Sequence, residues 1–214
     1  MPSDSDPDAV RDRLVEQPTD GTEAALTDAP VGVRHPARRG GRVTDVPAVA
    51  ARLTLADETI RLHDAPDERV TITLRFADIV YVREGRQEIN GTPVESLVIR
   101  HIDPPASAVT TTLSLWDDAA HARLTEIVTT YYRQQRAAIE QLRLSTTQLE
   151  ILVAAYSAGR EFDPASVLPK SADDIAALFQ PLRDADLLRE GDTGVFLTGR
   201  GHMVVNETLD DKTM

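Results

Sequence analysis

The sequence predicts an α+β chain, in which a β-rich part ends in a long helix and a mainly helical part follows. Apolar and polar residues alternate over much of residues 42–115, as they do in strands with one buried face. From about residue 116 to residue 143, apolar residues recur at steps of three and four, which is typical of one buried helix face. Beyond residue 144, shorter helical patterns are separated by glycine and proline.

The composition indicates a folded, acidic protein. With 214 residues, 41% of them hydrophobic, the chain is long enough to bury one large core or two small ones. Its net charge of −12 disfavours general affinity for nucleic acid or anionic lipid. Lys170 and Lys212 are the only lysines, so 21 of the 23 basic residues are arginine. An acidic, lysine-poor surface resembles proteins of salt-loving archaea, and an ordinary acidic protein from a GC-rich genome is the alternative.

Several classes of protein are disfavoured by what the sequence lacks. The absence of cysteine excludes disulfides, thiolate catalysis and cysteine-ligated zinc. No apolar run approaches the ~20 residues of a membrane span, and Met1–Asp8 lacks the basic and apolar character of a signal peptide. The sequence therefore predicts a soluble, cytoplasmic protein without a membrane partner.

Residues 1–30 are predicted to form an acidic, largely disordered tail. They are rich in Asp, Pro, Ser and Thr, a composition that buries little apolar surface. A short helical pattern occurs only around Asp8–Glu16.

Residues 31–143 are predicted to form a β domain with a closing helix. The helix spans about Trp116 to Arg143, and Ser114 with Asp117 three residues later forms its start box. The predicted strands are Ala51–Leu55, Thr59–His63, Val70–Phe76, Ile79–Val82, Leu97–Ile102 and Val109–Leu115. Antiparallel strands closed by one C-terminal helix predict a pleckstrin-homology-like (PH-like) β-barrel or sheet. Trp116 is interpreted as the plug of the barrel mouth, with a ligand-stacking aromatic as the alternative.

Residues 144–209 are predicted to form a winged helix-turn-helix domain, followed by a frayed end at residues 210–214. Ser145-Thr-Thr-Gln148 is a capping box that opens a first helix, and Gly159 ends it. The remaining elements are a short helix from Asp163 to Leu168, a third helix over Ser171–Leu187, a wing of Leu187–Arg189 and Val195–Leu197, and a closing helix over Thr198–Leu209.

No constellation of residues in the sequence predicts catalysis. The chain has no phosphate-binding glycine motif and no GxSxG nucleophile elbow. No two histidines have a metal-ligand spacing such as HxxxH, and a structural or surface role is favoured for each. They are His35, His63, His101, His121 and His202. We therefore predict a non-enzymatic protein with no catalytic residues, no metal and no cofactor.

The most basic stretch of this acidic chain surrounds the diglycine Gly40-Gly41, just before the first predicted strands. A diglycine allows a turn at positive φ, and guanidiniums offer planar, bidentate donors to carboxylate or phosphate. We predict a protein-docking loop made of Arg34, His35, Arg38, Arg39 and Arg42. The alternatives are a solvated loop whose arginines pair with local acids, and a staple between the β domain and the winged helix.

A winged helix also invites a DNA-binding interpretation, in which the third helix enters the major groove. That helix carries four aspartates against Arg183 alone, and the wing carries Glu190 and Asp192 against Arg189. A phosphate-facing surface needs the opposite charge. Protein contact is therefore the favoured use of this domain, and a DNA-binding transcription regulator is the alternative.

Several segments, in one shared order, resemble the archaeal taxis protein CheF family. The most specific is His35-Pro-Ala-Arg38 followed by Gly40-Gly-Arg-Val-Thr-Asp45. Further anchors are Val98-Ile-Arg-His101, Val109-Thr-Thr111, Ile151-Leu-Val-Ala-Ala-Tyr-Ser157, Leu197-Thr-Gly-Arg200 and Val204-Val-Asn206. The resemblance implies a chemotaxis adaptor that links the response regulator CheY, especially when phosphorylated, to switch proteins of the archaellum motor. Family members have a further β domain before the first segment, so the resemblance also implies a shortened chain.

Overall fold

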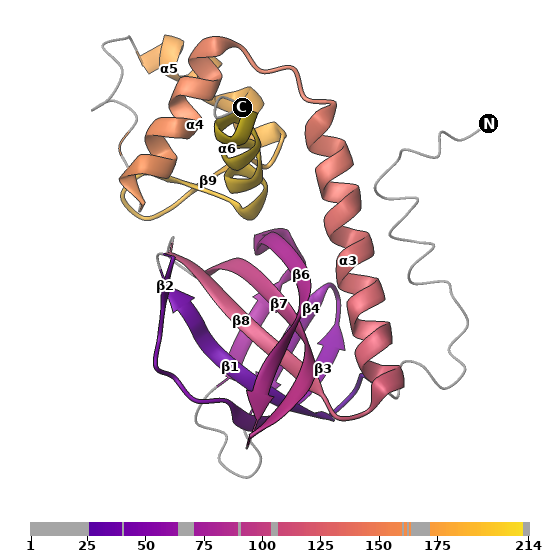
Figure 1. Cartoon of the computed structure of the whole chain (residues 1–214). Helices are drawn as coiled ribbons and strands as arrows, with labels where there is room; N and C mark the ends of the chain where they lie inside the picture. The colour runs from indigo at the N-terminus through magenta and orange to yellow at the C-terminus, as the bar shows by residue number, and fades with distance from the viewer. Residues whose placement is uncertain are drawn as a thin grey trace, which may run out of the picture.

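The computed structural model of this protein describes residues 26–39, 41–63, 71–89, 91–103, 107–159, 161, 163 and 172–211. In this part, a strongly twisted antiparallel sheet lies beside the long helix α3, and a group of shorter helices with a two-stranded sheet sits over one end of the large sheet (Figure 1). The predicted α+β class is confirmed. We call the large sheet with α3 the β part, and the segment after α3 the helical part.

The large sheet has eight strands within the described residues, and its paired neighbours are antiparallel. Its order is β5-β4-β3-β1-β8-β7-β6, with β2 paired to β1 outside this path. The strands are β1 (Ala29–Arg39), β2 (Arg42–Val43), β3 (Val49–Ala56), β4 (Thr59–His63), β5 (Thr71–Arg75), β6 (Ile79–Ile89), β7 (Thr92–Asp103) and β8 (Ser107–Leu115). A short 3-10 helix, η1 (Phe76–Asp78), connects β5 to β6.

Strand β1 lies at the centre of the sheet, although the sequence patterns did not predict it. Val31 and Val33 on this strand are buried, and its register with β8 shifts between Arg34 and Arg38. Pro36 lies in the irregular stretch, where its missing N–H interrupts no regular ladder. The loop predicted around the arginines is therefore wrong for residues 34–39, because they form the second half of a central strand.

The described chain joins the core ahead of β1. Leu26 is only 3% exposed, and together with Ala29 it belongs to the buried cluster of the β part. Residues 1–25, which carry the rest of the predicted tail and its short helix, lie outside the described residues.

Helix α3 (Asp118–Glu140) packs on the sheet through a buried stripe that includes Leu124. The helix is capped by Asp117, whose side chain accepts a hydrogen bond from the Ala120 N–H at 2.7 Å. The predicted start box with Ser114 is wrong, because Ser114 still lies in β8. The interpretation of Trp116 as a plug is also wrong, since Trp116 is 52% exposed and is not among the side chains that fill the core.

The helical part packs around a second core that includes the fully buried Leu152 and Leu182. Its elements are α4 (Thr146–Ala158), α5 (Ala172–Asp184), β9 (Leu188–Glu190), β10 (Val195–Leu197) and α6 (Gly199–Asp211). The predicted capping box of Ser145 and Gln148 is confirmed, with its two hydrogen bonds at 2.9 Å and 3.3 Å. The predicted helix from Asp163 to Leu168 falls, after Asp163, outside the described residues.

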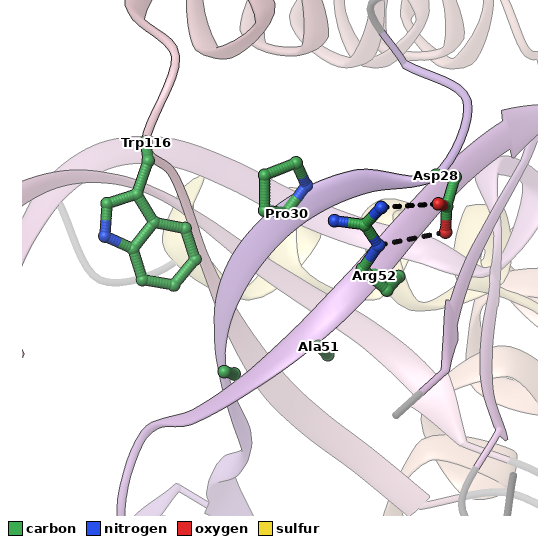
Figure 2. Close-up of a pocket in the computed structure, with 6 residues that line it drawn as sticks. Asp28, Pro30, Ala51, Arg52 and Trp116 are labelled. Atoms are coloured by element: carbon green, nitrogen blue, oxygen red, sulfur yellow. Dashed lines mark hydrogen bonds and ion pairs between the residues drawn. The ribbon is translucent and has the colours of Figure 1, made fainter. Parts of the chain in front are cut away.

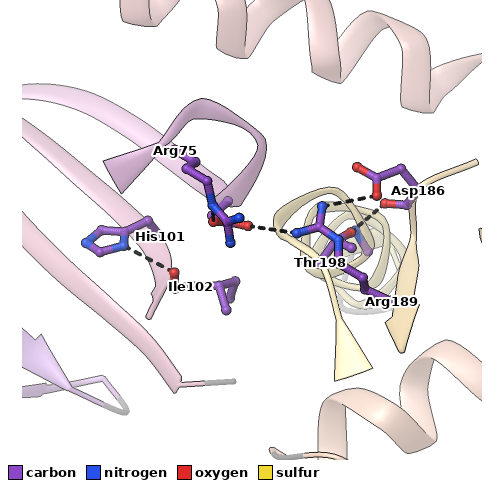
Figure 3. Close-up of polar contacts among 8 residues, drawn as sticks. Arg75, His101, Ile102, Asp186, Arg189 and Thr198 are labelled. Atoms are coloured by element: carbon purple, nitrogen blue, oxygen red, sulfur yellow. Dashed lines mark hydrogen bonds and ion pairs between the residues drawn. The ribbon is translucent and has the colours of Figure 1, made fainter. Parts of the chain in front are cut away.

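Helix α6 joins the two parts. Gly199 lies so close to η1 that a Cβ there would be 2.6 Å from the carbonyl carbon of Asp78. The Asp78 carboxylate accepts from Arg75 Nε at 2.8 Å and lies 3.8 Å from Arg189, the middle residue of β9. Figure 3 shows Arg75 and Arg189 on either side of this contact. These contacts, with packing at Gly199, fix the helical part against the sheet. No helix in the described part of the chain is long and apolar enough to cross a bilayer.

Candidate protein-binding surface

Three of the predicted docking arginines lie on a hairpin formed by β1 and β2. Arg38 pairs with Val43 and Arg39 pairs with Arg42 across the two strands. Gly41, at the turn, has a φ of 80°, a conformation that favours glycine. The predicted turn at the diglycine is confirmed at Gly41. This turn connects strands β1 and β2 of the sheet and does not lie in a loop ahead of the strands.

The register of this hairpin divides its side chains between two faces. Directly opposite residues of an antiparallel pair share a face, so Arg38 lies with Val43 and Arg39 lies with Arg42. All four side chains are exposed, and Val43 is 64% exposed. The hairpin therefore offers one face with two guanidiniums, and one face that combines a guanidinium with an apolar side chain.

The hairpin arginines have few partners within the protein. Arg39 lies 3.9 Å from the Asp103 carboxylate, and the side chains of this pair are 61% and 40% exposed. Exposed pairs of this kind contribute little, typically below about 1 kcal/mol. Arg38 and Arg42 form no ion pair with another described residue. Within the described part of the chain, neighbouring carboxylates therefore neutralise little of the charge of the hairpin.

Arg34 does not belong to this exposed set. Its Nε donates a hydrogen bond to the Val46 carbonyl at 2.7 Å, and its side chain is half-buried. It lines a cavity of about 410 Å³ together with Glu88 and Ile89. Its hydrogen bond to Val46 holds the segment between β2 and β3 against the sheet. Along β1, the register shift separates Arg34 from Arg38.

His35 anchors the base of the hairpin. Its Nδ1 lies 2.7 Å from the Thr111 hydroxyl, which also lies 2.9 Å from Nε2 of His101. The two imidazoles stack with centroids 5.8 Å apart and planes 19° apart. Because a hydroxyl both donates and accepts, Thr111 can satisfy both rings at once.

Burial sets the protonation of this histidine pair. Burial lowers the pKa of His101 to about 4, and it also lowers the pKa of His35. The Arg39 guanidinium lowers the pKa of His35 further, while the Asp103 carboxylate opposes the shift. Both rings are therefore neutral near pH 7, so that one can donate to the Thr111 oxygen while the other accepts the hydroxyl proton. Sequence spacing gave no signal of this pair, because β1 and β7 meet only through β8.

In the helical part, the cations expected to face DNA are already paired. Arg183 of α5 lies 2.9 Å from Glu190 of β9, and Arg189 pairs with Asp186 at 3.2 Å. The turn between β9 and β10 holds a carboxylate, since Glu161 accepts from the Thr193 N–H and hydroxyl. These described residues present no free cluster of positive charge to a phosphate backbone.

Comparison with known proteins identifies the family. The model of the family described as "Archaeal Chemotaxis signal transduction system protein F" matches residues 17–137, more than half of the chain. The chain belongs to this family. It is 28% identical over 189 residues to Taxis protein CheF2 of Halobacterium salinarum, and 24% identical over 191 residues to Taxis protein CheF1 of that organism. Each match covers 88% of this chain and 64% of the relative, so the chain spans less than two thirds of the length of these relatives.

Membership of the CheF family confirms the resemblance drawn from the sequence. The matched range contains the whole β1–β2 hairpin and ends within α3, whereas α4 to α6 lie beyond it. The exposed arginines therefore belong to the part of the chain that carries the family match.

No group of three His, Asp or Glu side chains placed to hold a metal occurs among the described residues.

Proposed function

We propose that this CheF-family chain is a non-enzymatic adaptor that links phosphorylated CheY to switch proteins of the archaellum motor. Its family is one of chemotaxis signal transduction proteins, and both relatives named above are taxis proteins. The observation that carries the proposal is the β1–β2 hairpin, where Arg38, Arg39 and Arg42 are exposed in a chain of net charge −12.

The chemistry of the hairpin suits an acidic protein partner. Guanidiniums bind carboxylates through paired, charge-assisted hydrogen bonds, which are stronger than bonds between neutral groups. Response regulators present carboxylates around their phosphoacceptor, and a phosphoryl group adds further negative charge. The anchored base at His35 supports this use, because a rigid hairpin loses little entropy on binding.

We also propose finer assignments for the two parts of the fold. The β part, over residues 31–143, is a PH-like domain, which is supported by its antiparallel strands followed by the single helix α3. The helical part, over residues 144–209, is a winged helix-turn-helix used for protein contact. Its support is the order of α4, α5, the β9–β10 hairpin and α6, together with the paired cations of α5 and β9.

Affinity purification from cells of the native organism tests the adaptor proposal. The tagged wild-type chain is expected to retain CheY and archaellum switch proteins. Reversal of charge by Arg38→Glu with Arg39→Glu is expected to remove CheY, while Arg61→Glu, an exposed arginine on β4, serves as the matched control. Retention of CheY by the double variant, with an unchanged melting temperature, would show that the hairpin is not the docking site.

A further inference from the structure

A second exposed feature lies at the other end of β1, where Trp116 faces a groove of about 520 Å³ (Figure 2). Pro30 of β1 and Ala50 of β3 line the groove, and Arg52 with Asp28 form its far wall. Along β1, this groove is about 30 Å from the arginine hairpin, from the usual rise of about 3.3 Å per residue. It is therefore a separate surface from the proposed docking hairpin.

Trp116 lies next to Gly32 of β1, where the absence of a side chain leaves room for Ile89. A Cβ at Gly32 would lie 3.4 Å from the Trp116 ring atom Cη2 and 2.6 Å from Cδ1 of Ile89. The indole edge thus rests against the backbone of β1, while 52% of the residue stays in solvent. A large aromatic held in this way presents its ring to the groove instead of packing into the core.

The far wall of the groove carries a hydrogen-bond donor that no described residue uses. Arg52 donates from Nε and Nη2 to the two oxygens of Asp28, at 3.0 Å and 2.5 Å. These hydrogen bonds are the main reason why the pKa of Asp28 is lowered, and the pair therefore stays ionised near neutral pH. The remaining nitrogen, Nη1, points away from Asp28, toward the side on which Pro30 and Trp116 lie (Figure 2).

Negative charge borders the aromatic wall. Asp117 and Asp118 follow Trp116 directly, and both are exposed. One oxygen of Asp117 caps α3 through the Ala120 N–H, and Asp118 forms no ion pair with another described residue. These two carboxylates do not line the groove, but they give the chain next to Trp116 a negative charge that complements a cationic side chain of a ligand.

We propose that this groove binds a proline-containing, extended segment of a partner protein with an arginine or lysine beside the prolines. Such a segment adopts the polyproline II conformation, which makes no internal hydrogen bonds and leaves its carbonyls free. A proline ring packs on the Trp116 face, as in other aromatic-lined grooves that bind these segments. The Arg52 Nη1 donates to one of the free carbonyls, and the basic residue pairs with Asp117 and Asp118.

Trp116 is the only tryptophan of the chain, so its fluorescence reports on this groove alone. The probe is the synthetic peptide Ala-Pro-Pro-Leu-Pro-Pro-Arg-Ala, titrated into the full-length protein. We expect a saturable blue shift of the emission, because a bound peptide removes the indole from water. Two control peptides replace either every proline with alanine or the arginine with glutamate, and each is expected to bind at least tenfold more weakly.

Two variants test whether the fluorescence shift comes from peptide bound in this groove. Ala50→Arg fills the groove from β3 and is expected to abolish the shift, with its melting temperature measured to show that the fold is intact. Asp118→Lys is expected to weaken the peptide at least tenfold, whereas Asp192→Lys, exposed between β9 and β10, is the matched control. Equal binding of the alanine peptide, or a shift that survives Ala50→Arg, would overturn the proposal. A blue shift that appears with rising protein concentration alone would instead assign the groove to a second copy of the chain.

Discussion

Replacing Thr111 with valine tests the anchor beneath the arginine hairpin. The hydroxyl lies between His35 and His101, and Thr111 is fully buried. Valine has nearly the same shape, so the change removes the hydrogen bonds without leaving a cavity. An unsatisfied buried polar group costs about 1–3 kcal/mol. His101 is 2% exposed and loses this partner inside the core, whereas the half-buried His35 can turn toward water. We expect a loss of about 2 kcal/mol in the free energy of unfolding.

Urea denaturation at constant salt measures this loss. The midpoint is expected to fall with an unchanged slope, because the surface exposed on unfolding stays the same. Thr112→Val is the matched control, since Thr112 is also buried on β8 but makes no side-chain hydrogen bond to a described residue. If Thr111→Val costs no more than this control, the shared hydroxyl does not hold the hairpin base.

The joint between the two parts and the buried histidines give further predictions. Gly199→Ala places a Cβ within 2.6–2.8 Å of the backbone of Ala77 and Asp78, and it should lower the melting temperature by several degrees. An unchanged melting temperature would contradict this close approach. Burial lowers the pKa of His101 and of His202 to about 4, from an ordinary value of 6.5. The unfolded chain therefore binds these protons more readily, and the stability contributed by the neutral rings is present above pH 6.5 and is lost as the pH falls toward 4. His101→Gln should flatten this dependence in urea midpoints measured between pH 7 and pH 4.5, and an equally steep loss would contradict it.

The sequence predicted the elements whose local signals agree with their tertiary setting. The strand pattern of Thr59–His63 became β4 with the same bounds, and the capping box at Ser145 opens α4. In β1 the local and tertiary signals disagree. Val31 and Val33 alternate inward, but Pro36 and the register shift break the pattern that a strand search needs.

The candidate surface was predicted in composition but not in geometry. Arg38 and Arg39 are exposed, as a docking surface requires. Their separation onto two faces follows from the pairing of β1 with β2, which the sequence did not predict. Arg34 was grouped with them, and only the fold reveals its bond to the Val46 carbonyl. The contact of His35 with His101 depends on strand order, which no local spacing encodes.

The most direct test of the account is the affinity of the purified chain for purified CheY, held in its active state with beryllofluoride, by isothermal titration calorimetry. A charge-assisted hydrogen bond contributes about 1.5–3 kcal/mol, so Arg39→Glu with Arg42→Glu should weaken binding at least tenfold. Arg38→Glu alone changes the other face of the hairpin, so its affinity shows whether CheY also contacts that face. Arg61→Glu should bind CheY as the wild type does. Wild-type affinity in every one of these variants would contradict the claim that the β1–β2 hairpin receives the response regulator.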